Sequence, residues 1–150
     1  MREFSSGIIV FRRSLGERLY LLLHYHYRGD YWDFPRGNIK NGETTKQAAV
    51  RETGEETGLW EVDVEFMEAF EESASWHYRL RGQTVFKRVT YFLAETERED
   101  IKISSEHVGY RWLRFADALR LLKYKNSKKL LLKAEEFLQR REEQDATTAG

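Results

Sequence analysis

Three glutamates stand at helical spacing near the middle of this 150-residue chain. Glu52, Glu55 and Glu56 are related by i, i+3 and i, i+4, so a helix would place all three within an arc of roughly 100°. Their like charges repel one another and destabilise the helix, whereas a bound divalent cation would make the cluster favourable. Carboxylate oxygens with no Cys or His among them suit a hard ion and not zinc. The cluster therefore predicts a site for Mg²⁺, for which Mn²⁺ could substitute.

The neighbouring residues predict where this helix begins and ends. Thr44 and Gln47 have the spacing of a capping box at a helix N-terminus. Gly58 stands where a left-handed residue would end the helix. We therefore expect a helix over residues 45–57, with the three glutamates in its second half.

Residues around the glutamates could support them. Arg51 lies four residues before Glu55 and could orient a carboxylate or neutralise part of the cluster. Glu43, in the preceding loop, is a suitable partner for Arg51. Gly37 and Gly42 would let the loop backbone approach a metal or a phosphate closely. We therefore expect the loop and the helix to form one functional unit.

The segment from residue 37 to residue 58 has the pattern G-x5-E-x7-R-E-x-x-E-E-x-G, with every specified position filled. An isolated Glu-x-x-Glu-Glu is most often a solvated helix face, but seven fixed residues at fixed spacing hardly recur by chance. The pattern resembles the signature of the Nudix hydrolases. Thr53 stands where this family usually has an aliphatic residue, and Gly54 beside it is a poor helix former. We interpret this as a variation in packing, since no ligand is lost.

The resemblance implies a fold and a reaction. The fold would be an α+β protein, an α/β/α sandwich with a mixed β-sheet, and the reaction the hydrolysis of a nucleoside diphosphate linked to another moiety. The metal ligands and catalytic carboxylates would be the three glutamates of the helix, joined by the Gly37 carbonyl as a ligand. Arg51 and Glu43 would support them structurally.

Motifs outside the signature resemble one group of this family, the asymmetrical diadenosine tetraphosphate hydrolases. They follow one another in the same order, and Arg36 in the second motif is a candidate substrate-binding residue. The motifs are Gly7-Ile-Ile-Val-Phe-Arg-Arg13, Trp32-Asp-Phe-Pro35-Arg-Gly37, Ser105-Glu106-His107 and Tyr110-Arg-Trp-Leu113.

This closer resemblance implies roles for four further residues. Glu106 would be a further metal ligand or catalytic carboxylate, and His107 beside it could orient it. Lys87 would contact phosphates, and Tyr78 and Tyr124 would enclose one adenine. Base stacking on aromatic rings contributes about 1–3 kcal/mol and tolerates different bases, so the preference for adenine should be modest. Cross-strand packing is the alternative role for Tyr78.

The expected reaction is the Mg²⁺-dependent hydrolysis of diadenosine tetraphosphate to ATP and AMP, in which one glutamate accepts a proton from the attacking water. Removal of pyrophosphate from the 5′ end of RNA is an alternative with the same signature. The neutral net charge counts against it, and the basic C-terminal helix favours it. A diphosphoinositol polyphosphate would need more basic residues around the pocket. A non-catalytic nucleotide sensor is disfavoured because every signature glutamate is retained.

Hydrophobic periodicity predicts the elements that must position these residues. Strands interleave with a few helices, which is typical of a mixed α/β or α+β sandwich. We expect one domain over residues 1–141 and a polar tail over 142–150 that frays. The expected strands cover residues 7–11, 18–25, 62–70, 76–80, 85–93 and 110–113, and the expected helices cover 45–57, 115–123 and 127–140.

Composition restricts the class of protein. The chain has 25 basic and 25 acidic residues, and this balance argues against binding nucleic acid through bulk electrostatics. The lack of cysteine excludes disulfides and a thiolate zinc site, and it suits a reducing cytoplasm. The first residues do not resemble a signal peptide, and no stretch reaches the length of a membrane span. The expected partner is a small nucleotide, with no membrane and no nucleic acid other than an RNA 5′ end, and we favour a monomer.

Overall fold

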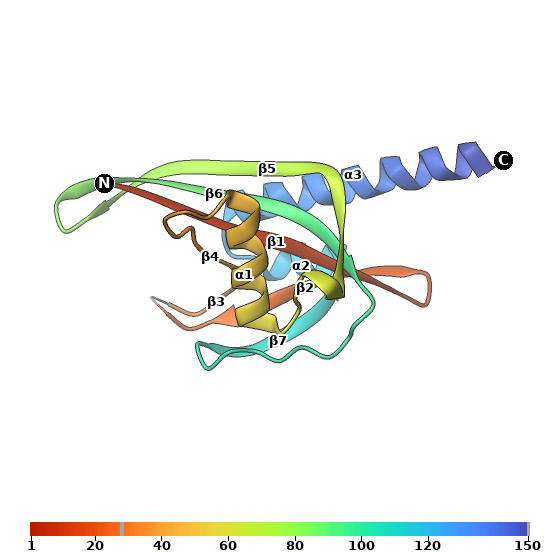
Figure 1. Cartoon of the computed structure of the whole chain (residues 1–150), viewed down its shortest axis with the longest axis horizontal. Coiled ribbons are helices and arrows are strands. Elements are labelled where there is room, and N and C mark those ends of the chain that lie inside the picture. The colour runs from red at the N-terminus through yellow and green to blue at the C-terminus, as the bar shows by residue number, and fades with distance from the viewer. Residues whose placement is uncertain (28, 150) are drawn as a thin grey trace.

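A mixed β-sheet forms the centre of the molecule, with helices on both of its faces (Figure 1). The computed structural model describes residues 1–27 and 29–149, and within these residues seven strands join into one sheet. The strands are β1 (Arg2–Ser14), β2 (Glu17–Tyr25), β3 (Tyr31–Asp33), β4 (Arg36–Asn38), β5 (Val64–Leu80), β6 (Gln83–Thr96) and β7 (His107–Arg114). The helices are α1 (Thr45–Thr57), α2 (Phe115–Leu121), α3 (Lys125–Ala149) and a short 3₁₀ turn, η1 (Glu61–Asp63).

The strand order makes the sheet mixed. Along the sheet the strands follow one another as β3-β2-β1-β6-β5, with β4 paired to β1 and β7 paired to β2. β1 and β6 are parallel, whereas the other paired strands run antiparallel. The predicted hairpin between β5 and β6 turns at Arg81 and Gly82, both of which have positive φ.

Alternate residues of β1 point to opposite faces of the sheet and belong to two separate cores. Ile8 and Val10 pack in one core with Ala49 of α1. Ile9 and Phe11 pack in the other core with residues of α2 and α3. The sheet therefore lies between α1 on one side and the α2–α3 pair on the other (Figure 1). This arrangement confirms the predicted α/β/α sandwich.

Helix α1 begins and ends where the sequence predicts. The Thr44 hydroxyl accepts a hydrogen bond from the Gln47 amide at 3.1 Å, and the Gln47 side chain accepts one from the Thr44 amide at 2.9 Å. Gly58 ends the helix in the left-handed conformation, with a φ of 75°. The capping box and the C-cap glycine therefore fix the helix that carries the three glutamates.

The two unusual residues of α1 face the interior. A Cβ atom on Gly54 would lie 2.1 Å from the indole ring of Trp60, so glycine leaves room for that ring. Thr53 is completely buried, and its hydroxyl has no hydrogen-bond partner among residues 1–27 and 29–149. Burying an unpaired hydroxyl destabilises a protein. Glycine at 54 therefore improves the packing of the interior, whereas threonine at 53 lowers the stability of the protein.

The structure differs from the predicted strands at several places, since β1 begins five residues earlier than predicted and residues 62 and 63 belong to η1. The pattern predicts no strand at β3 or β4, because three-residue strands are too short to show a periodicity. It predicts two separate strands, 62–70 and 76–80, where β5 runs without interruption from Val64 to Leu80. The mostly polar residues 71–75 separate the two predicted strands in the sequence, and the pairing of β5 with β6 is irregular just before them, between Phe66 and Glu71.

Helix α3 continues through the segment expected to fray. Residues 142–149 are helical, and Gly150 lies outside the described residues. The Glu142 carboxylate lies 2.7 Å from the guanidinium of Arg13 and also pairs with Arg18. These contacts with β1 and β2 explain why the helix extends past residue 141. No helix within the described part of the chain is both long and apolar enough to cross a membrane.

Candidate active site

Gly37, in β4, lies directly against the Glu52 carboxylate. A Cβ atom built on Gly37 would come within 2.0 Å of the Glu52 Cδ and 2.1 Å of its Oε2. Any larger residue would therefore displace the carboxylate. Pairing of Gly37 with Ser6 of β1 fixes this strand to the sheet, so the sheet determines where the Glu52 carboxylate rests.

Arg51 joins the loop to the helix. Its guanidinium donates to both carboxylate oxygens of Glu43, at 2.6 Å and 3.0 Å, and to the Asn38 carbonyl at 3.0 Å. It also donates to Glu52 at 2.8 Å and to Glu55 at 3.3 Å. Hydrogen bonding by Arg51 is the main reason that the pKa of Glu43 falls to about 2. The expected pair of Arg51 and Glu43 is therefore present, and Arg51 neutralises part of the carboxylate cluster.

Glu56 is the most buried of the signature glutamates, with 6% of its surface exposed. The Tyr25 hydroxyl lies 3.1 Å from its Oε2 and 2.7 Å from the Phe34 carbonyl, so its single proton is shared between these two oxygens. His107 Nε2 lies 3.2 Å from the same oxygen, without the geometry of a hydrogen bond. Burial raises the pKa of Glu56, and the neighbouring His107 opposes that shift. His107, which the sequence suggests could orient Glu106, therefore contacts Glu56 instead.

Glu52 and Glu56 face a cleft of about 780 Å³ that we call the carboxylate cleft. Glu106 lines the same cleft from the turn before β7. Glu55 does not line it, because its half-exposed carboxylate pairs with Arg51. Of the four carboxylates predicted as metal ligands, three therefore share one cleft, and Gly37 lies there with them.

The donor groups of the cleft suit a hard divalent cation. Within residues 1–27 and 29–149, no group of three or more His, Cys, Asp or Glu side chains could hold a metal ion as they stand. The cleft nevertheless presents oxygen donors, with the Glu52 carboxylate in the space over Gly37 that a Cβ would fill. Oxygen donors without thiolate are the ligands that Mg²⁺ and Mn²⁺ prefer.

A second cavity, of about 610 Å³, contains both predicted base-stacking residues, and we call it the aromatic cavity. Tyr78 comes from β5 and Tyr124 from the segment before α3. The Tyr78 hydroxyl donates to Glu3 at 2.7 Å. Tyr124 packs edge-to-face on Tyr31, with ring centroids 5.4 Å apart. Trp76, two residues before Tyr78 in the same strand, adds a third aromatic side chain.

Arg36 and Lys87 line both the carboxylate cleft and the aromatic cavity. Arg36 pairs with Asp33 at 2.6 Å, and its guanidinium lies 5.5 Å from the centre of the Tyr25 ring. Lys87 donates to the Ser5 hydroxyl at 2.7 Å, and burial lowers the pKa of Lys87. Two cations therefore stand at the passage between the carboxylates and the aromatic rings.

This arrangement belongs to a family of known proteins. The NUDIX domain family matches residues 1–134, which include every residue that lines the carboxylate cleft and the aromatic cavity. The chain belongs to the Nudix family.

Relatives of this Nudix chain share most of its length. The asymmetrical bis(5′-nucleosyl)-tetraphosphatase of Caenorhabditis elegans is 31% identical over 89% of this chain and 95% of its own. The enzyme of the same name from Mus musculus is 33% identical over 88% of this chain and 92% of its own. The crystal structure of a C. elegans Ap4A hydrolase binary complex has a TM-score of 0.81 and 31% identity, covering 91% of this chain and 97% of that one. The chain is therefore a Nudix hydrolase, and such hydrolases generally use divalent metal ions.

Sequence reasoning overlooked two residues of this Nudix site. Tyr25, interpreted only as the end of a strand, contacts Glu56 from 31 positions away, and no local pattern indicates that contact. Trp76, interpreted only as the start of a strand, lines the aromatic cavity. Its separation from Tyr78 by two residues, which places both on one face of a strand, is the signal that could have revealed it.

Proposed function

We propose that this Nudix hydrolase acts on dinucleoside polyphosphates and cuts diadenosine tetraphosphate into ATP and AMP. The observation that carries the proposal is the connection between the aromatic cavity and the carboxylate cleft. A base held between Tyr78 and Tyr124 would extend its phosphates past Arg36 and Lys87 toward the glutamates. The activity named for the two relatives above supports the same substrate.

The two parts of the passage would bind different parts of the substrate. Stacking of a base on aromatic rings contributes about 1–3 kcal/mol and tolerates different bases, so the cavity would accept more than adenine. The planar guanidinium of Arg36 can bind two phosphate oxygens at once. Lys87 acts as a compact charge beside it. Both cations would therefore hold the polyphosphate chain at the entrance of the carboxylate cleft.

The carboxylate cleft would hold Mg²⁺, or Mn²⁺ in its place. When bound, the metal neutralises phosphate charge and lowers the pKa of a bound water. Arg51 contributes by fixing the loop to the helix through Glu43 and by sharing the negative charge of the cluster. The residues that would hold the metal are Glu52, Glu56, Glu106 and the carbonyl of Gly37, joined by Glu55 once its carboxylate leaves Arg51 and turns into the cleft.

We assign the role of proton acceptor to Glu56. Its carboxylate is the most buried of the signature glutamates and faces the carboxylate cleft, where the attacking water would lie. Tyr25 and His107 both contact its Oε2 and thereby fix the orientation of the group.

The test is product analysis by ion-exchange chromatography, after incubation with diadenosine tetraphosphate and Mg²⁺ in water enriched in heavy oxygen. We expect ATP and AMP, with the label in AMP. Two ADP molecules would contradict the asymmetric cut. An absence of turnover with either Mg²⁺ or Mn²⁺ would contradict the proposal and favour an RNA 5′ end or a sensor role.

We further propose that the enzyme works as a cytoplasmic monomer. Residues of a single chain line both the carboxylate cleft and the aromatic cavity, and the lack of cysteine suits a reducing compartment. Light scattering coupled to size-exclusion chromatography should give a mass near 17.9 kDa. A mass of twice that value would contradict the monomer.

A further inference from the structure

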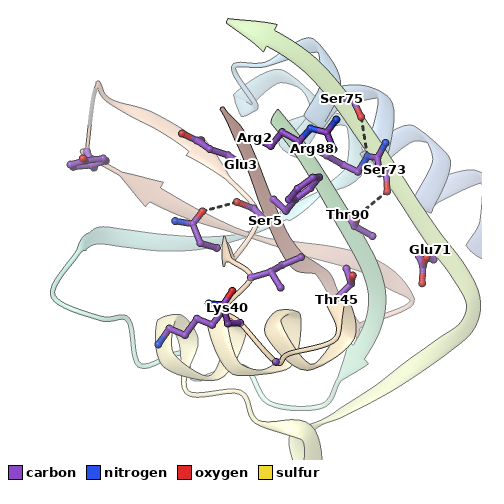
Figure 2. Close-up of a pocket in the computed structure, with 16 residues that line it drawn as sticks. Arg2, Glu3, Ser5, Lys40, Thr45, Glu71, Ser73, Ser75, Arg88 and Thr90 are labelled. Atoms are coloured by element: carbon purple, nitrogen blue, oxygen red, sulfur yellow. Dashed lines mark hydrogen bonds between the residues drawn. The ribbon is translucent and has the colours of Figure 1, made fainter. Parts of the chain in front are cut away.

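A third hollow, which we call the distal groove, runs along the sheet beside α1 (Figure 2). Its volume is about 1250 Å³, larger than that of the carboxylate cleft or the aromatic cavity. Its walls are residues 2–5 of β1, residues 38–42 at the end of β4 and after it, and side chains of β5 and β6. The roles assigned so far leave this groove without a ligand.

Strand register brings cations and hydroxyls to one face of the sheet in this groove. Phe4 of β1 is the register partner of Arg88 of β6, which in turn lies opposite Ser75 of β5. Thr90 lies opposite Ser73 in the same way, with their hydroxyls 2.7 Å apart. Register partners share a face of the sheet, and this is the face that α1 covers farther along β1. The distal groove is therefore the part of that face beyond α1.

Three cations line the distal groove, and none forms an ion pair with a carboxylate among residues 1–27 and 29–149. They are Arg2, Lys40 and Arg88. Arg88 donates to the neutral hydroxyl of Ser75 at 3.3 Å. In Figure 2, Arg2 and Arg88 lie together toward one end of the groove, and Lys40 lies toward the other end beside α1. The groove therefore presents cations at both of these ends.

The distal groove also offers an exposed aromatic ring. Phe4 is 40% exposed, and its ring packs edge-to-face on that of Phe86, with ring centroids 6.3 Å apart. Two carboxylates, Glu3 and Glu71, line the groove against three cations, and Glu3 is paired with Lys87 at 3.5 Å. A nucleobase stacks on aromatic rings and on guanidinium planes. An exposed ring beside two arginines therefore suits a base.

The distal groove opens into the carboxylate cleft, because Ser5, Asn38 and Lys40 line both of them. The Ser5 hydroxyl donates to Asn38 Oδ1 at 3.1 Å and accepts from Lys87 Nζ at 2.7 Å. Lys87 in turn lines the aromatic cavity. The carboxylate cleft therefore has the aromatic cavity on one side and the distal groove on the other.

We propose that the distal groove binds the second nucleoside of the dinucleoside polyphosphate, the one released as the nucleoside monophosphate. This inference rests on the proposed function and adds a site to it. The base lies against Phe4 and the guanidinium groups of Arg2 and Arg88. The hydroxyls of Ser73 and Ser75 face the ribose, and Lys40 is the cation nearest to the cleft, where the monophosphate forms.

The test compares two substrates that differ only in the second nucleoside. Diadenosine tetraphosphate carries the second nucleoside, whereas adenosine tetraphosphate lacks it and ends in a free phosphate. The variant carries Arg2→Ala and Arg88→Ala, both at exposed positions. The matched control carries Arg120→Ala and Arg140→Ala, two exposed arginines on α2 and α3 outside the three hollows. Circular dichroism and melting temperatures establish that both variants fold.

We expect the groove variant to lower kcat/KM for diadenosine tetraphosphate by about tenfold or more, through a raised KM. Its KM for adenosine tetraphosphate should stay within about twofold of wild type, because that substrate does not reach the distal groove. If the enzyme does not hydrolyse adenosine tetraphosphate, the inhibition constant Ki of this compound as a competitive inhibitor is compared instead of KM. The control variant should match wild type on both compounds.

Two results would overturn the inference while leaving the proposed function intact. In one, wild type cuts diadenosine tetraphosphate and the groove variant is equally active. In the other, the variant binds both compounds more weakly and to the same extent. That result would mean that the arginines act on a part of the substrate common to both compounds. Failure of wild type itself to cut diadenosine tetraphosphate would instead overturn the proposed function, and this inference with it.

Discussion

The carboxylate of Glu52 lies so close to Gly37 that a methyl group on the glycine would come within 2.0 Å of its Cδ. Glycine in β4 therefore determines where a carboxylate of the helix can rest. The two residues are fifteen positions apart, and the spacing of the signature reflects this contact between β4 and α1.

Gly37→Ala should lower kcat by about 100-fold or more, because a displacement of about 1 Å at a catalytic group has effects of that size. Steady-state hydrolysis of diadenosine tetraphosphate measures it. Gly109→Ala is the matched control, since nothing lies within 4 Å of a Cβ at that position. Equal activity of the two variants would show that the position of Glu52 does not matter for turnover.

Thr53→Val should stabilise the protein by about 1 kcal/mol or more, because it removes a buried hydroxyl that has no partner. Thermal unfolding should show a rise of about 2–4 °C for each kcal/mol. Thr57→Val provides the contrast. The Thr57 hydroxyl donates to the Thr53 carbonyl at 2.6 Å and accepts from the Leu59 amide at 3.1 Å, so its loss should lower the melting temperature. A drop with both variants would contradict this account of Thr53.

Gly54→Ala should destabilise the protein, although alanine is the better helix former by about 1 kcal/mol. The added methyl group would lie 2.1 Å from the Trp60 ring and displace it. In a Trp60→Ala background the same change should become stabilising, since the obstacle is gone. Unfolding free energies of the four proteins in this double-mutant cycle measure the coupling. Additive effects would mean that the indole ring is not the reason for glycine.

The pair of Glu43 and Arg51 should make stability depend on pH in the acid range. The folded pKa of Glu43 is about 2, below its ordinary value of 4.5, because Arg51 hydrogen-bonds to it. A depressed pKa means that the carboxylate stabilises the fold fully above the unfolded value, and that this contribution disappears as pH falls from 4.5 toward 2. The unfolding free energies of wild type and Glu43→Gln should therefore differ at pH 6 and converge near pH 2. Glu68→Gln, at an exposed position on β5, provides the baseline. A difference that stays constant over this range would contradict the pairing.

Glu56→Gln should lower turnover by about 10²–10⁴-fold while the fold stays intact, because the amide cannot accept a proton. Glutamine has nearly the same shape and can still accept the hydrogen bond that Tyr25 donates. Single-turnover kinetics and circular dichroism measure the two properties separately. Activity equal to that of wild type would remove Glu56 from the mechanism.

The part of the site that could be predicted from sequence consists of contacts within one segment. Arg51 reaches Glu43 across eight residues, and the capping box spans three, so spacing alone indicates both. The contacts of Glu56 depend on tertiary structure. Tyr25 and His107 meet it only because β2 pairs with β7 in a sheet whose order no local pattern shows. The distal groove was missed for the same reason, since its arginines come from β1 and β6, which are parallel neighbours far apart in the chain.

The aromatic cavity is built from segments far apart in the chain, with Tyr78 in β5 and Tyr124 just before α3. The unit of Gly37, Arg51 and Glu52 is contained in β4, its loop and α1. In the proposed function, mutations in the aromatic cavity would therefore alter the choice of base without disturbing the reaction in the carboxylate cleft. During evolution, this separation would let a lineage acquire new substrates by drift in β5 and in the segment before α3, while one inherited loop and helix kept the same chemistry.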